Sequence, residues 1–88
     1  MAIYLVTYDL NQETIRPKIV KKFDDFPDWV RLSESSYAVT ANVDADQIYN
    51  HFKPLLDNND VLYVIRLSGP PYGQGDDEVN QWLMQNLN

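Results

Sequence analysis

Hydrophobic residues follow two different periods along the chain, and the first is the alternation typical of β-strands. Residues 2–9 (AIYLVTYD) are β-branched and aromatic and lead into a polar, turn-like stretch, so they predict a strand. Residues 29–32 and 36–41 predict two more strands, joined by a turn at 33–35. Residues 61–67 (VLYVIRL) carry the strongest strand pattern in the chain.

The second period is close to 3.6 residues and predicts helices. The first helix covers residues 15–25, where Pro17 fits the first turn and Pro27 lies just beyond the end. Its apolar stripe consists of four residues: Ile15, Ile19, Val20 and Phe23.

Two further segments have helical spacing. Asp44 and Gln47 form a capping box at the start of a helix over residues 44–56, and Pro54 is expected to kink that helix or end it early. Residues 76–87 predict a short amphipathic tail helix, with an acidic start that suits the helix dipole.

The resulting order of elements is β-α-β-β-α-β followed by the tail helix. This order predicts an α+β, ferredoxin-like sandwich, formed as one domain over residues 1–88. The first strand is apolar on both faces, so both faces should be covered. We expect two helices to cover one face and the face with Tyr4 and Tyr8 to be left for the tail helix or a second copy of the chain.

The composition restricts the class of protein. Hydrophobic residues make up 44% of the 88 residues, enough for a small core. Cysteine is absent, which excludes disulfides, thiolate nucleophiles and iron–sulfur clusters. The N-terminal run lacks the features of a signal peptide, and no segment is long enough to span a bilayer. We therefore expect a cytoplasmic protein with no membrane partner.

Charge is distributed unevenly along the chain. The net charge is −6, from seven basic and thirteen acidic residues. Residues 44–88 hold seven acidic and only two basic side chains. Four of the basic residues fall within seven positions of the first helix, namely Arg16, Lys18, Lys21 and Lys22. This cluster is the candidate nucleic-acid-binding site, because phosphate neutralisation provides most of the affinity for nucleic acid; a solvated helix face is the alternative.

Asp9, at the end of the first strand, is the candidate for catalysis and for metal binding. A carboxylate at this position can hold a hard cation such as Mg²⁺ or Mn²⁺. Two copies in a symmetric dimer can converge on one ion that activates water for phosphodiester cleavage. The alternative is that Asp9 caps the turn at residues 10–12.

Other polar and aromatic residues have simpler interpretations. The serines of the 33–36 turn and the acidic residues at 57, 60 and 76–78 are expected to be turn and cap residues, and His51 an isolated exposed histidine. Four tyrosines of the strands can stack on bases or be buried in a dimer, and burial is the favoured interpretation: Tyr4, Tyr8, Tyr37 and Tyr63.

Several segments together resemble a known family. They are YLVTYDLN (4–11), SESSYAVTA (33–41), FKPLLDNNDVLYVIRL (52–67) and NQWLMQNL (80–87). In these segments the chain resembles the small SinR-like proteins, which are related in fold to CRISPR-associated protein 2 and more distantly to virulence-associated protein D.

The resemblance implies a ferredoxin-like homodimer. It implies either metal-dependent cleavage of nucleic acid, with Asp9 at the family's acidic position, or non-catalytic clamping of duplex DNA. Given the acidic charge balance, we expect nuclease activity to be vestigial or absent. The alternative function is that of an acidic regulator or inhibitor, which binds a protein partner by mimicking phosphate charge.

Overall fold

The computed structural model describes residues 1–87 as an α+β fold with a four-stranded antiparallel sheet and three α-helices. In chain order the elements are β1 Ala2–Asp9, α1 Arg16–Lys22, β2 Asp28–Ser33, β3 Ser36–Ala41, α2 Ala45–Phe52, β4 Val61–Leu67 and α3 Asp77–Asn86. Single 3₁₀ turns extend α1 at both ends and α2 at its C-terminal end. Each expected strand and helix is confirmed to within a few residues.

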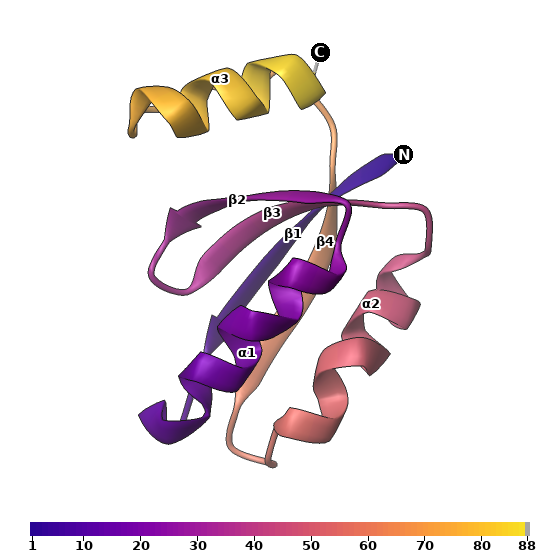
Figure 1. The fold of residues 1–88 in the computed structure, drawn as a ribbon, viewed down its shortest axis with the longest axis vertical. Helices are drawn as coiled ribbons and strands as arrows, with labels where there is room; N and C mark the ends of the chain where they lie inside the picture. The colour runs from indigo at the N-terminus through magenta and orange to yellow at the C-terminus, as the bar shows by residue number, and fades with distance from the viewer. Residues whose placement is uncertain (88) are drawn as a thin grey trace.

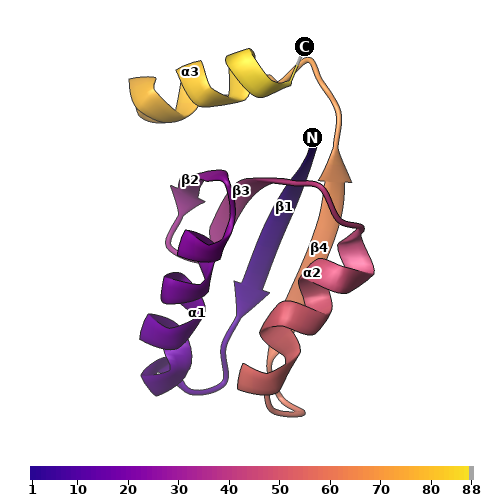
Figure 2. The same ribbon diagram turned by 45° about the vertical axis from the view of Figure 1, so that its right-hand side comes forward.

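The strands lie in the order β2-β3-β1-β4, and every neighbouring pair is antiparallel. The central strand β1 therefore pairs on both sides, whereas β2 and β4 form the edges. Helices α1 and α2 lie beside each other on one side of the sheet, and α3 lies apart from both (Figures 1 and 2).

Proline and the capping box set the helix ends as the sequence indicates. Pro17 occupies the first turn of α1. At the start of α2 the side chain of Gln47 accepts a hydrogen bond from the backbone amide of Asp44 at 3.0 Å. The α-helix ends at Phe52, and Pro54 falls in the 3₁₀ turn that follows, because proline lacks the amide donor that a longer helix needs.

The face of the sheet that α1 and α2 cover is the opposite of the expected one. Tyr4, Tyr8 and Tyr37 are buried in the core with residues of both helices, and Ile3 and Leu5 lie on the other face. These three tyrosines are therefore neither a base-stacking platform nor a dimer surface. Alternation shows which residues share a face, but with both faces apolar it does not show which face the helices cover.

Aromatic rings fill this core. The ring of Phe23, which follows the last turn of α1, stacks on Tyr37 of β3 with a centroid distance of 3.9 Å and an interplanar angle of 9°. Phe52 of α2 lies 5.1 Å from the same ring, and Tyr8 of β1 lies 6.5 Å away. One side chain thus joins both helices to the two middle strands.

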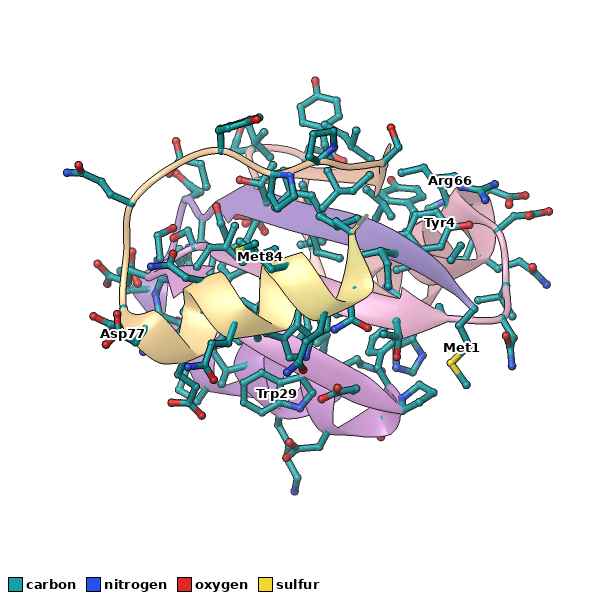
Figure 3. The ribbon with its side chains drawn as sticks, turned by 90° about the horizontal axis from the view of Figure 1, so that it is seen from above. Met1, Tyr4, Trp29, Arg66, Asp77 and Met84 are labelled. Carbon is teal, nitrogen blue, oxygen red and sulfur yellow. The ribbon has the colours of Figure 1, made fainter. Side chains whose placement is uncertain are left out.

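The tail helix packs on the sheet as expected, but it covers part of the second face, the one with Ile3 and Leu5, and not the face with Tyr4 and Tyr8. Helix α3 packs against β2, where the indole nitrogen of Trp82 donates a hydrogen bond to the carboxylate of Asp28 at 3.0 Å. Leu87 is buried at the end of the helix. In Figure 3, which is seen from the side of α3, Arg66 of β4 lies away from this helix. The cover therefore lies over the β2 side of the sheet.

Replacing Phe23 should destabilise the protein more than any surface substitution. We expect Phe23→Ala to lower the free energy of unfolding by about 3–5 kcal/mol, because it removes a fully buried ring and leaves a cavity between α1, α2 and the sheet. Urea unfolding followed by circular dichroism measures this loss, and Phe23→Leu provides a milder variant if Phe23→Ala does not fold. The matched control is Tyr72→Ala, since Tyr72 is 94% exposed; equal losses for the two sites would contradict the assignment.

Candidate functional site

Asp9 is the last residue of β1 and is exposed. Its backbone lies opposite Val61, the first residue of β4. The turn that follows β1 is organised by a different carboxylate: Asp60 accepts hydrogen bonds from the amides of Asn11 at 2.7 Å and Asp57 at 2.9 Å. The capping role considered for Asp9 thus belongs to Asp60, 51 positions further along the chain, which no local sequence pattern reveals.

The donor set around Asp9 does not fit a divalent cation within one chain. Mg²⁺ and Mn²⁺ require several oxygen ligands in a near-octahedral arrangement. Among residues 1–87, no group of three or more acidic or histidine side chains is placed to hold a metal ion. One exposed carboxylate provides too few ligands to hold either ion within one chain.

Arg16 does not present a free guanidinium. It donates two hydrogen bonds to the carboxylate of Glu13, at 2.6 and 3.1 Å. It also donates to the backbone carbonyl of Glu34 at 2.8 Å and to the hydroxyl of Ser35 at 3.0 Å. Its charged carbon lies 5.5 Å from the ring centre of Tyr8. Arg16 therefore fastens the start of α1 to the β2–β3 turn, and this explains the serine in that turn.

Three groups around Arg16 have shifted pKa values. Hydrogen bonding from Arg16 lowers the pKa of the Glu13 carboxyl, and the same bond raises the pKa of the guanidinium. Burial raises the pKa of the Tyr8 phenol, and the neighbouring Tyr37 adds to that effect. Tyr8 consequently stays neutral through the physiological range, as a core residue should.

The three lysines of the cluster differ from Arg16. Lys18 and Lys21 are exposed and Lys22 is half-buried, all on α1. Residues three and four positions apart are neighbours on a helix surface, so Lys18 lies next to both of the others. Within residues 1–87, Arg16 and His51 are the only basic side chains that form ion pairs. The ammonium groups of the three lysines therefore remain available to an anion.

His51 is not the isolated histidine that the sequence suggested. Its Nε2 lies 2.8 Å from a carboxylate oxygen of Asp25, and its ring packs edge-on against Phe26 and Phe52. The partners are 26 residues apart and meet because α2 lies beside the end of α1. The sequence holds no signal for this pair.

The second face of the sheet is most exposed at β4. Residues in register across the four strands form a row in which Val30 of β2 is 8% exposed, Ala38 of β3 is buried, Leu5 of β1 is half-buried and Ile65 of β4 is 49% exposed. Tyr63, two residues before Ile65, is 63% exposed. Helix α3 thus covers Val30 on the β2 half of this face, where Leu32 stays 39% exposed, and leaves the β4 half open.

We call the exposed apolar side chains of this open half the β4 row: Val61, Tyr63 and Ile65. Single exposed apolar residues are ordinary, but a contiguous set on one strand is typical of an interaction surface. Of the four strand tyrosines considered for a surface role, only Tyr63 is available for one.

Comparison with protein-family models, curated proteins and solved structures gave no match. Among the residues that the structure describes, no helix is both long and apolar enough to cross a membrane. Two surfaces described above are candidates for function: the lysines of α1 and the β4 row.

The ion pair between Glu13 and Arg16 should make stability depend on pH in the acidic range. The pKa of Glu13 is lower in the folded state than its ordinary value of 4.5, so its contribution is complete above that value and is lost as the pH falls through the folded pKa. We expect wild type to be more stable than Glu13→Gln at neutral pH, and the difference to shrink below pH 4.5. Thermal unfolding of both proteins across this range measures the effect; a difference that grows on acidification would contradict it.

Proposed function

We propose that the protein is a homodimeric, ferredoxin-like binding module that contacts nucleic acid without cleaving it. The observation that carries the proposal is the β4 row, an apolar surface that α3 leaves open. The strand order β2-β3-β1-β4 with two helices on one face supports the ferredoxin-like assignment. The resemblance to the SinR-like proteins and CRISPR-associated protein 2, which implies a homodimer that cleaves or clamps nucleic acid, supports the dimer and the nucleic-acid ligand.

The dimer is proposed because a small chain can bury more of its apolar surface by association. A domain of this size buries only about two thirds of the surface of its unfolded chain, and association is a common way to bury more. The β4 row has half-buried apolar neighbours, Leu5 of β1 and Leu67 of β4, on the same face. Two copies that pack these faces together would remove the exposed ring of Tyr63 from water.

Nucleic acid is the proposed ligand because of the lysines of α1. Lys18, Lys21 and Lys22 have no acidic partner within the described chain, and a dimer would present two such sets. Arg16 does not belong to this surface, because Glu13 and the β2–β3 turn already hold it. With so few charges, binding should be weak and strongly dependent on salt.

Catalysis is not part of the proposal. Cleavage through a bound Mg²⁺ or Mn²⁺ would need more ligands than Asp9 offers in one chain, so Asp9 would have to meet its copy across a dimer axis. The alternative function, an acidic protein that occupies the basic groove of a partner, is favoured by the net charge of −6.

A charge placed in the β4 row should dissociate the dimer. We expect wild type at micromolar concentration to sediment with twice the chain mass of 10.3 kDa, and Tyr63→Lys to sediment as a monomer, because the dimer would bury the new ammonium group without a partner. The matched control is Tyr72→Lys, which changes a tyrosine in the loop before α3 and should leave the dimer intact. Wild type that sediments as a monomer would refute the dimer.

Removing the lysines of α1 should abolish binding to nucleic acid. We expect wild type to bind a fluorescein-labelled DNA duplex at low salt, and the triple variant Lys18→Ala, Lys21→Ala, Lys22→Ala to lose that binding, because its phosphate contacts are gone. Fluorescence anisotropy at increasing salt measures the affinity. Lys53→Ala, which removes a lysine after α2 instead, is the matched control.

The same duplex and an RNA strand, incubated with Mg²⁺ or Mn²⁺, test for cleavage. We expect both to remain intact with wild type. Cleavage that disappears in Asp9→Asn would establish the enzyme and overturn the non-catalytic proposal. Equal duplex binding by wild type and the triple lysine variant would overturn the nucleic-acid surface.

A further inference from the structure

The outer edge of β4 borders a groove that does not include the lysines of α1. Strand β4 pairs with β1 on one side only, so it is an edge of the sheet. An edge strand presents a row of backbone amide and carbonyl groups to which another strand can pair. Helix α3 packs at β2, the opposite edge, and leaves the β4 edge uncovered.

A groove of about 450 Å³ runs along this edge. One wall is the first two turns of α2 and the other is β4 itself. The residues that line it are Ala45, Asp46, Tyr49, Asp60, Val61, Leu62, Tyr63 and Val64. A helix wall beside a free strand edge is the geometry in which an extended peptide adds to a sheet, with the backbone paired to the strand and alternate side chains directed toward the helix.

The charge of the groove specifies the occupant. Asp46 and Asp60 lie in its lining, and the lining contains no lysine or arginine. The two amide hydrogen bonds to Asp60 hold that carboxylate in place at the start of β4. Tyr49, 38% exposed on α2, adds an aromatic side chain to the lining. An extended segment with basic residues separated by apolar ones matches this lining.

We propose that the groove between α2 and the β4 edge binds a basic, extended segment of a partner protein by strand addition. The proposal does not require the dimer, because the strand edge and α2 belong to one chain, although Val61 and Tyr63 contribute to both the groove lining and the β4 row. It is also independent of nucleic acid, because the groove lining is acidic. If the protein acts as an acidic regulator of a basic partner, which is the alternative function above, this groove is the site where the partner binds.

The probe is a fluorescein-labelled peptide of sequence KVTVKV. Two matched peptides separate the parts of the proposal: EVTVEV reverses the charge, and KVPVKV removes one backbone amide donor and disfavours the paired strand. We expect KVTVKV to bind wild type at millimolar concentration or below in anisotropy titrations at low salt. The other two peptides should bind at least several-fold more weakly.

The protein variants Asp46→Asn and Asp77→Asn complete the design. Both remove one carboxylate from the first turn of a helix, α2 and α3 respectively, so they change net charge and helix dipole alike. Asp46→Asn should weaken KVTVKV binding about two- to five-fold, the range expected for one exposed ion pair. Asp77→Asn should leave it unchanged, and hydrogen exchange at the amides of β4 should slow when KVTVKV binds to wild type.

Four results would overturn the proposal. KVTVKV and KVPVKV could bind equally, which would show charge attraction without strand addition. Asp77→Asn could weaken binding as much as Asp46→Asn, which would show that the peptide does not bind in the groove. An unlabelled DNA duplex that displaces the peptide would assign the surface to nucleic acid. Peptide binding that weakens as the protein self-associates would assign the edge to a second copy.

Discussion

The stack between Phe23 and Tyr37 is the interaction on which the rest of the structure depends. The two rings lie 3.9 Å apart and almost parallel, and both are buried. Phe23 follows α1, Tyr37 lies on β3, and Phe52 of α2 packs against the same ring. Because the rings fill the space between helices and sheet, they determine which face of the sheet α1 and α2 cover.

Once that face is covered, every surface available for function lies elsewhere. Helix α3 is the only further α-helix among the described residues, and it covers the β2 side of the second face. Ile65 of β4 is therefore 49% exposed, whereas Val30 of β2 is 8% exposed. The same asymmetry leaves β4 as an open edge beside α2. The binding surfaces we propose for a second copy and for a basic peptide both follow from the position of α3.

Much of the fold could be predicted from the sequence, because strand alternation, the capping box at Asp44 and the helix-ending Pro54 are local signals. The covered face could not, since β1 is apolar on both sides and the decision rests on contacts between Tyr8, Tyr37 and distant helix residues. The candidate site was less predictable still. Arg16 was expected to be a free cation but serves as a structural link, and His51 has a partner that only the packing of α2 reveals.

If the protein is a dimer as proposed, association in solution buries the β4 half of the second face. Hydroxyl-radical footprinting of the unmodified protein over a range of concentrations tests it directly, because two tyrosines in the same sample provide signal and reference. We expect oxidation of Tyr63 to fall as the protein concentration rises, whereas oxidation of Tyr72, which is 94% exposed, should stay constant. Equal reactivity of Tyr63 at all concentrations would contradict it.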